Sequence, residues 1–295
     1  MPIDSTQAEV EFNTDAILGE GPVWDEEQEK LYWLDIISGE LFRYDPASKT
    51  NTVYKIGEHV GAVSMRRKGG LVMATQSGFS FFDPDTGRIT VINHPESQIK
   101  SNRFNDGKCD PQGRFWAGTM AYDISEGTGS LYCLNKDLSV DLKLAQLTIP
   151  NGLAWNGQRD QFFFIDTPTR KIFSFDYDGP SGSISNRSVI REFSVDDGFP
   201  DGMTIDTDDH LWVAMYGGSK VQRINPVSGN TVYEVHLPVP QVTSCTFGGF
   251  KFNELYITTC RENMSEQALK QAPLSGSIFK ARLPFRGLAS FRFDG

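Results

Sequence analysis

The sequence predicts an all-β protein folded as a six-bladed β-propeller, with four antiparallel strands in each blade. Short runs rich in aromatic and β-branched residues, which favour strands, recur six times along the chain. Each run belongs to the same four-strand pattern, and a four-strand repeat with a period in the forties is typical of propellers. Because the repeats extend along the whole chain, we expect residues 1–295 to form a single propeller domain.

The second strand of each predicted blade is the clearest part of the repeat. These six runs begin at residues 31, 71, 115, 162, 211 and 255, so their successive spacings are 40, 44, 47, 49 and 44 residues. Phe162–Asp166 and Leu211–Met215 are examples, and both are short segments of strand-forming residues. A pair of packed β-sheets would also use many short strands, but it would not explain six copies of one pattern.

The innermost strand of each blade precedes that run and ends in a turn. The six predicted innermost strands are Gly21–Asp25, Gly61–Met65, Gly107–Pro111, Gly152–Asn156, Gly202–Asp206 and Thr243–Phe247. After each run comes a segment that alternates apolar and polar residues, as half-buried antiparallel strands do, and then a further strand such as Thr52–Ile56. We expect Glu9–Asn13 to close the ring as the outer strand of the last blade, which removes an exposed edge. Only Ser265–Lys270 resembles a helix of more than a turn or two.

Composition excludes several classes of protein. Lys plus Arg is 28 and Asp plus Glu is 38, and a net charge of −10 argues against a nucleic-acid partner. No apolar run reaches the length of a membrane span, and the first residues lack the pattern of a secretory signal. The four cysteines have no C-x-x-C spacing, which indicates buried thiols in a reducing compartment. We therefore expect a cytoplasmic protein without a membrane partner, as a monomer or weak dimer.

The repeat also aligns oxygen-bearing side chains at one mouth of the predicted channel. Each innermost strand lines the channel, and the residue ahead of its first glycine is Glu20, Asp106, Asn151 or Asp201 in four of the six blades. Asn105 stands one position earlier in blade three. Taken singly, an Asn-Gly or Asp-Gly pair is a common hairpin turn, but four in register indicate a shared site.

Converging carboxylates repel one another and are costly to bury, so a cation is expected to hold them together. All-oxygen ligands suit a hard divalent ion such as Ca²⁺, Mg²⁺ or Mn²⁺. The four histidines show no H-x-x-H pairing, and the chain contains neither a G-x-S-x-G nucleophile motif nor a phosphate-binding loop.

Several segments together resemble the regucalcin (senescence marker protein 30)/gluconolactonase family. They include Asn102–Lys108, Ile149–Trp155 and Pro200–Asp206, and the resemblance extends from about Glu20 to Arg282. It implies a six-bladed propeller that hydrolyses sugar lactones on one divalent metal ion. The ion expected first is Ca²⁺, with Zn²⁺, Mg²⁺, Mn²⁺ and Fe²⁺ as alternatives.

The resemblance also assigns roles to particular residues. It makes Glu20, Asn151 and Asp201 the metal ligands, with Asp201 also the catalytic acid/base. It places substrate contacts on Arg103, Asn105 and Asp123; the animal members have Glu at the last position, so Asp123 has a shorter side chain. The loop that contains Asp123, residues 122–129, is also shorter than in the animal members, which implies a more open pocket.

Chemistry agrees with these roles. A metal polarises the lactone carbonyl, a carboxylate deprotonates the attacking water, and Arg103 and Asn105 could hold ring hydroxyls. Two alternatives remain: a broader esterase that includes organophosphates among its substrates, and a non-enzymatic calcium-binding regulator.

Overall fold

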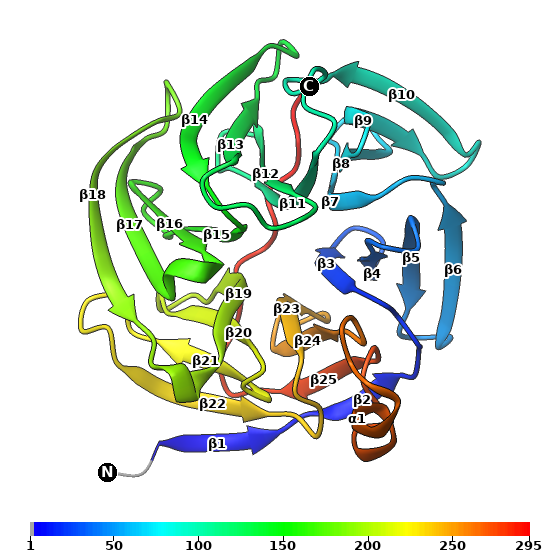
Figure 1. The fold of residues 1–295 in the computed structure, drawn as a ribbon, viewed down its shortest axis with the longest axis vertical. Helices are drawn as coiled ribbons and strands as arrows, with labels where there is room; N and C mark the ends of the chain where they lie inside the picture. The colour runs from blue at the N-terminus through cyan, green and yellow to red at the C-terminus, as the bar shows by residue number, and fades with distance from the viewer. Residues whose placement is uncertain (1–2) are drawn as a thin grey trace.

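Six β-sheets surround a central axis in the computed structural model, which describes residues 3–295 (Figure 1). Each sheet is one blade, and in blades one to four the strands run in chain order from the axis to the rim. Blade one consists of β3 (Gly19–Asp25), β4 (Lys30–Asp35), β5 (Glu40–Asp45) and β6 (Thr50–Lys55). Blade two consists of β7 (Val60–Met65), β8 (Leu71–Thr75), β9 (Gly78–Asp83) and β10 (Arg88–Asn93). Blade three consists of β11 (Asn102–Cys109), β12 (Phe115–Ala121), β13 (Gly129–Leu134) and β14 (Val140–Leu147).

The second half of the ring repeats this arrangement and confirms the predicted fold. Blade four consists of β15 (Pro150–Trp155), β16 (Gln161–Asp166), β17 (Lys171–Asp178) and β18 (Ser183–Glu192). Blade five consists of β19 (Phe199–Ile205), β20 (Leu211–Tyr216), β21 (Lys220–Ile224) and β22 (Thr231–His236). Blade six takes β23 (Val242–Gly248), β24 (Glu254–Thr259) and β25 (Ile278–Arg282) from the end of the chain.

The N-terminal segment closes the ring as predicted. Strand β2 (Glu9–Phe12) pairs antiparallel with β25, with Glu9 opposite Lys280, and so becomes the outer strand of blade six. The sequence did not predict β1 (Asp4–Gln7), which pairs in parallel with β22 of blade five. One continuous segment therefore covers the outer edges of two neighbouring blades, and both edges lose their unpaired backbone groups.

Helical structure is minor within the described residues. Helix α1 (Glu266–Gln271) lies in the predicted segment, and Ser265 caps it by accepting a hydrogen bond from the N–H of Ala268. Two short 3₁₀ turns, η1 (Thr167–Thr169) and η2 (Val195–Asp197), lie in the loops. No helix among residues 3–295 has the length and apolarity needed to cross a membrane.

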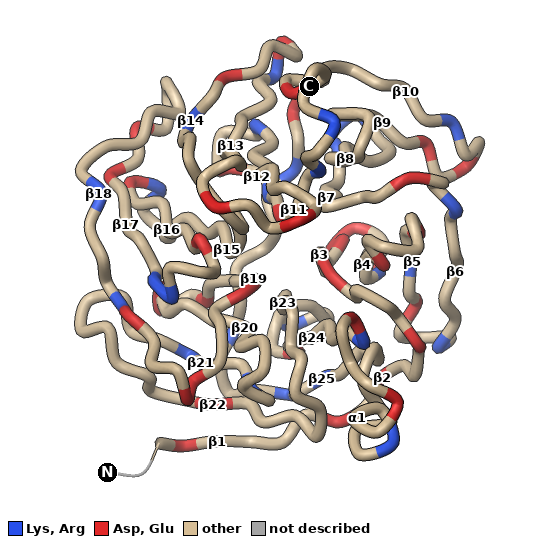
Figure 2. The backbone as a smooth tube through the Cα atoms, viewed as in Figure 1, with Lys and Arg blue, Asp and Glu red and all other residues tan. Residues whose placement is uncertain are grey.

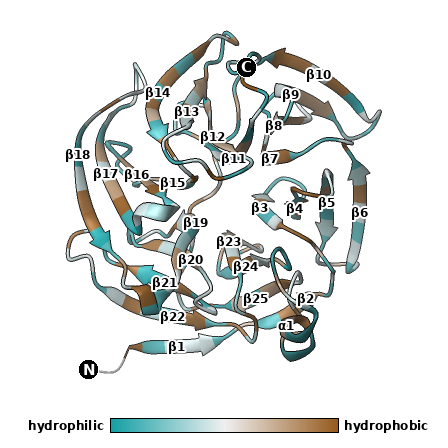
Figure 3. Cartoon of the chain, in the orientation of Figure 1, coloured by the Kyte–Doolittle hydropathy of each residue, from teal (hydrophilic) through white to brown (hydrophobic). Residues whose placement is uncertain are grey.

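The hydrophobic core is divided among the interfaces between blades. Each of six buried clusters combines residues of two neighbouring blades; Trp116 of blade three, for example, packs on Phe162 of blade four with ring centroids 5.3 Å apart. Inner strands such as β7 are buried along their whole length, whereas outer strands such as β14 are mostly exposed or half-buried. Hydrophobic and hydrophilic residues are interspersed along the outer strand β14 (Figure 3). All four cysteines are buried and free, as the sequence indicated.

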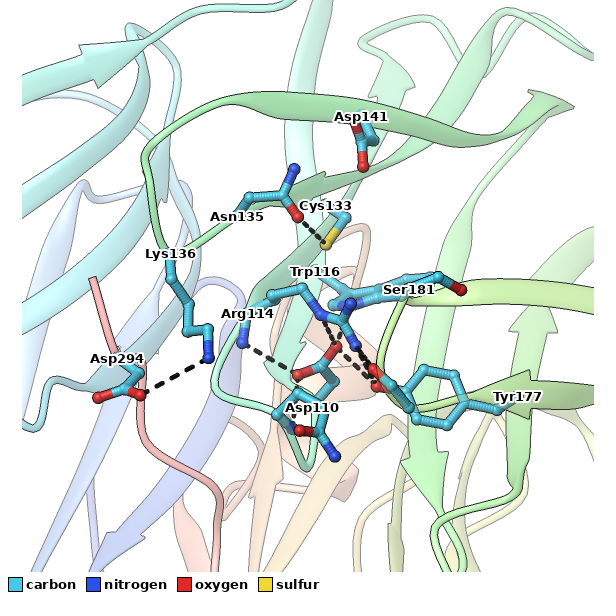
Figure 4. A network of polar contacts seen from close by, with 12 residues as sticks. Asp110, Arg114, Trp116, Cys133, Asn135, Lys136, Asp141, Tyr177, Ser181 and Asp294 are labelled. Atoms are coloured by element: carbon cyan, nitrogen blue, oxygen red, sulfur yellow. Dashed lines mark hydrogen bonds and ion pairs between the residues drawn. The ribbon is translucent and has the colours of Figure 1, made fainter.

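Buried aspartates secure the turns at the end of several innermost strands. Asp110 accepts hydrogen bonds from Arg114 Nε at 2.6 Å, Trp116 Nε1 at 2.9 Å and the Tyr177 hydroxyl at 2.8 Å (Figure 4). Because Tyr177 belongs to blade four, this network ties blade three to its neighbour. Asp206 of blade five makes the matching bonds to Trp212 Nε1 and to an arginine.

The C-terminal segment crosses the end of the channel at which the innermost strands finish (Figure 1). Its Gly287 forms a β-bridge with Asp206, and its Phe293 forms one with Arg66 of blade two. Arg292 also pairs with Asp25 of blade one at 2.6 Å. This end of the channel is therefore covered, and the pocket that contains Glu20 and Asp201 lies at the opposite end.

Candidate active site

All six innermost strands are irregular at the same level of the ring. Each pairing with the second strand contains a β-bulge, between Glu20 and Val23, Val60 and Ala62, Phe104 and Gly107, Asn151 and Leu153, Pro200 and Met203, or Val242 and Ser244. A bulge adds a residue to one strand and redirects a side chain. Glu20, Asn151 and Asp201 therefore lie within the innermost strands, whereas the repeat pattern had placed them just ahead of those strands.

A pocket of about 450 Å³ lies at this level, at the open mouth of the channel. Glu20, Asn151 and Asp201 line it together with Arg103 and Asn105, and all five side chains are buried. The structure therefore brings together five of the six residues to which the family resemblance assigned roles. Its remaining walls are largely apolar and include Leu18, Ile37, Met120, Ile124, Ile149 and Phe199.

Blade three contributes Asn105 to the pocket, and this corrects the register inferred from the Asp-Gly pattern. Asp106 had been aligned with Glu20 and Asp201, but it lines a smaller cavity farther down the channel. The bulge between Phe104 and Gly107 places these two neighbouring side chains at different levels. In these four blades an aspartate or asparagine ends the innermost strand or directly follows it, and Glu20, Asn105, Asn151 and Asp201 each stand five positions before that residue, so counting back from it finds the right side chain.

Two aspartates position the start of the strands that carry Glu20 and Asn151. Asp35, at the end of β4, accepts hydrogen bonds from the N–H groups of Ile17 and Leu18. Asp166, at the end of β16, does the same for the N–H groups of Thr148 and Ile149. Each carboxylate thereby ties the second strand of a blade to the segment just ahead of its innermost strand.

A chain of side-chain hydrogen bonds connects blades three, four and five around the pocket. Arg103 Nη1 donates to Asn105 Oδ1 at 2.9 Å, and Asn105 Nδ2 donates to Asn151 Oδ1 at 2.9 Å. Asn151 Nδ2 then donates to Thr167 Oγ1 at 2.9 Å, and the Thr167 hydroxyl donates to the carbonyl of Pro200 at 2.8 Å. Arginine is only a donor and a carbonyl only an acceptor, so both amides can take just one orientation.

Glycines follow three residues of the pocket, Glu20, Asn151 and Asp201, for steric reasons. Gly152 has a φ of +45°, a backbone conformation that side chains disfavour. Gly202 has ordinary dihedral angles, but a Cβ there would lie 2.1 Å from Ser244 Oγ of blade six. The glycine after Asp201 therefore allows blades five and six to approach closely beside the site.

The site is strongly acidic, as the tube view indicates at β3, β11 and β19 around the axis (Figure 2). Burial, with the nearby Asp106, raises the pKa of Glu20. Burial and then Glu20 raise the pKa of Asp201 well above its usual range. Burial also raises the pKa of Asp106. Three neighbouring carboxyl groups thus resist ionisation together, because water is excluded and their charges repel.

One buried cation lies beneath these carboxylates. Lys108 projects into the channel from β11, and its ammonium donates a hydrogen bond to the carbonyl of Met203 at 2.6 Å. Burial lowers its pKa, whereas Asp106 acts in the opposite direction and favours the charged form. Arg103 is a second buried cation at this site and favours the ionised form of Glu20, so Lys108 and Arg103 together offset only part of the negative charge of these carboxylates.

Asp123, which the family resemblance made a substrate contact, also lies outside the pocket. It is exposed, and its Oδ1 accepts hydrogen bonds from the N–H and hydroxyl of Ser125. Its neighbours Tyr122 and Ile124 line the pocket instead. Its predicted contact with substrate is therefore not supported by this loop conformation.

Sequence reasoning missed several polar residues of the pocket, among them Thr167 and Glu262. Both lie in loops that follow the second strand of a blade, after β16 and β24 respectively. The second strand of each blade runs antiparallel to the innermost strand. It therefore ends at the level at which the innermost strand begins, which is the level of Glu20 and Asp201. The strand order alone could therefore have placed these loops at the same mouth.

These features define a class of protein: a six-bladed propeller with an oxygen-rich, small-molecule-sized pocket at one mouth of its channel. A model of the SMP-30/gluconolactonase/LRE-like region matches residues 18–261. The chain belongs to that family.

Individual relatives extend along nearly the whole chain. The YvrE protein of Bacillus subtilis, whose name provisionally assigns it the activity of a sugar lactone lactonase, is 40% identical over 98% of this chain and 99% of its own. Regucalcin of Xenopus laevis is 37% identical over 94% of this chain and 95% of its own. The solved structure of a calcium-binding regucalcin from Agrobacterium tumefaciens superposes with a TM-score of 0.95 at 26% identity, covering 99% of both chains.

Proposed function

We propose that this protein hydrolyses sugar lactones to the corresponding aldonic acids at the pocket formed by Glu20, Arg103, Asn105, Asn151 and Asp201. The convergence of these five buried polar side chains from four blades is the observation that carries the proposal. Family membership and the name of the Bacillus subtilis relative support the substrate class. A volume of about 450 Å³ also suits a monosaccharide-sized ligand.

The residues present fit a divalent cation. No three His, Cys, Asp or Glu side chains within residues 3–295 form a metal cluster by themselves. The proposed set differs because its third ligand is an amide, and the hydrogen bond from Asn105 orients the carbonyl oxygen of Asn151. That oxygen keeps a second lone pair, and the carboxylates of Glu20 and Asp201 have no salt bridge within the described chain.

Charge arithmetic supports the same conclusion. With Glu262, the four carboxylates at the site carry −4 when ionised, Arg103 and Lys108 supply +2, and a divalent cation would bring the sum to zero. An all-oxygen donor set favours a hard ion. We propose Ca²⁺ first, because the Agrobacterium relative is described as calcium-binding.

A divalent cation held there would supply Lewis-acid polarisation of the lactone carbonyl. Asp201, buried and raised in pKa, is proposed to accept a proton from the attacking water and return it to the leaving ring oxygen. Arg103 is proposed to bind substrate oxygens with the N–H groups that its bonds to Asn105 and Phe104 leave free, and to steady charge that develops on the carbonyl oxygen.

The decisive experiment follows acid release from gluconolactone with a pH indicator. Protein treated with a chelator and then dialysed should lose activity, and adding back one divalent ion should restore it. If the purified protein fails to accelerate gluconolactone hydrolysis with every divalent ion tested and also without added metal, the proposed function is wrong.

A broader ester hydrolase is the second candidate, because the outer wall of the pocket is apolar. Leu18, Ile37 and Phe199 could contact hydrophobic acyl or aryl groups as readily as a sugar ring. Turnover of aryl esters or organophosphates faster than gluconolactone would favour this reading. Cation binding without turnover of any ester would instead favour a calcium-binding regulator.

A further inference from the structure

Glu262 is a pocket carboxylate to which the proposed reaction gives no role. It lies in the connection between β24 and β25, where its backbone N–H donates to the carbonyl of Ile17 at 2.9 Å. Its side chain is half-buried and lines the pocket. Across the described chain, no hydrogen-bond donor and no basic group within 4 Å pairs with its carboxylate, so its oxygens remain available to a ligand.

The other charged residues of the pocket are already accounted for. Glu20 and Asp201 are the proposed ligands of the cation, and Arg103 is held by Asn105. Burial raises the pKa of Glu262, whereas the positive charge of Arg103 acts in the opposite direction. Glu262 and Arg103 thus act electrostatically on one another within the same pocket, which gives that pocket both an acceptor and a donor for ligand hydroxyl groups.

The loop expected to supply such an acceptor does not do so. Asp123 is exposed and its Oδ1 is occupied by Ser125, while the side chains on either side of it, Tyr122 and Ile124, line the pocket. A polyhydroxylated ligand in this pocket would therefore meet the carboxylate of blade six rather than that of blade three.

We propose that Glu262 is a specificity-determining residue that accepts hydrogen bonds from hydroxyl groups of the substrate. This inference rests on the proposed function. A carboxylate has two acceptor oxygens and can bind two neighbouring hydroxyls at once. A lactone without hydroxyls would displace water from Glu262 and leave it unpaired, which disfavours binding of that lactone. Glu262 thereby selects polyhydroxylated lactones over aliphatic ones.

The test compares two lactones in two variants. For Glu262→Gln, kcat/KM for gluconolactone relative to γ-butyrolactone should fall by about tenfold or more, mainly through a higher KM for gluconolactone. Glu266→Gln, an exposed substitution four residues away on α1, should leave the ratio unchanged. An unchanged ratio in Glu262→Gln, or a fall only in Asp123→Asn, would overturn the proposal.

A binding measurement separates this inference from the proposed function. Titration calorimetry with the open-chain polyol glucitol reports the hydroxyl contacts without any turnover. If Glu262→Gln weakens glucitol binding in a protein that hydrolyses no lactone, the hydroxyl contact stands and the lactonase proposal fails. If glucitol binds the wild type and Glu262→Gln equally well, the role of Glu262 is overturned whatever the activity.

Discussion

Asn105 Nδ2 donates a hydrogen bond to Asn151 Oδ1 across the boundary between blades three and four, at 2.9 Å. The same Nδ2 also donates to the carbonyl of Pro150, the residue just before Asn151. A proposed substrate-binding residue therefore orients a proposed cation ligand. Occupation of the two subsites is expected to be coupled, because both depend on the position of this amide pair.

We expect Asn105→Ala to weaken cation affinity by about tenfold, although Asn105 is not a proposed ligand. Without its amide, the Asn151 side chain loses the bond that orients its oxygen. Thr167→Val removes the hydroxyl that accepts a hydrogen bond from Asn151 Nδ2, and it should weaken cation affinity to a similar extent. Titration calorimetry with Ca²⁺ measures both. An Asn105→Ala variant with wild-type cation affinity and only a raised KM would show that the amide serves the substrate alone.

Asp201→Asn is expected to leave the protein folded but to lower the rate by about 10²–10⁴-fold at saturating cation. Asparagine keeps the shape and one ligand oxygen, but it cannot accept the proton of the attacking water. Indicator assays with circular dichroism as the folding check would measure this, with the exposed turn substitution Asp85→Asn as control. Near wild-type turnover by Asp201→Asn would transfer the role of base to Glu20, the other proposed carboxylate ligand in the pocket.

Metal-free protein should lose stability as the pH rises from about 4.5 to about 8. Burial and Asp106 raise the pKa of Glu20 from 4.5 to about 8. Within that window the folded carboxyl keeps a proton that the unfolded chain has released, so the stabilisation present at low pH disappears as pH rises through the folded value. Thermal unfolding of chelated protein should show this decline, and Glu20→Gln should flatten it.

A bound divalent cation should counter this decline. At a hundredfold excess over its Kd it adds about 3 kcal/mol by mass action, and its affinity rises with pH because it competes with protons. The increase in Tm should therefore be larger at pH 8 than at pH 5. An equal increase at both pH values would contradict the proposed carboxylate ligands.

Lys108 and Asp106 are expected to affect cation affinity in opposite directions. Asp106→Asn removes a negative charge beside Glu20 and should weaken binding, whereas Lys108→Met removes the buried positive charge and should strengthen it, each by roughly tenfold. Lys108→Met should also lower the Tm of chelated protein, because the three carboxylates lose one of their two nearby counter-charges, the other being Arg103. Calorimetry measures the cation affinities of both variants. If both affinities rise, or both fall, relative to the wild type, the proposed charge balance is wrong.

Two features of the site could only be settled by the folded chain. Asn105 and Asp106 are adjacent polar residues, and the spacing of glycines favoured Asp106; the bulge in β11 decided for Asn105, because a shift of one residue in a strand redirects the side chain. Asp123 and Glu262 lie in loops whose conformations depend on contacts such as those of Ser125 and Ile17. Such contacts leave no periodic trace in the sequence.

The sequence by itself determined the six-bladed architecture, the closing strand expected at Glu9–Asn13, and the common level of Glu20, Asn151 and Asp201. It could do so because strand alternation and the four-strand repeat are local patterns, and a ring converts an equal position in each repeat into proximity. Only the tertiary structure decided the added parallel strand β1, the relay through Thr167, and which carboxylate faces the pocket. Those depend on how neighbouring blades and loops pack against one another, and residues far apart in the chain make those contacts.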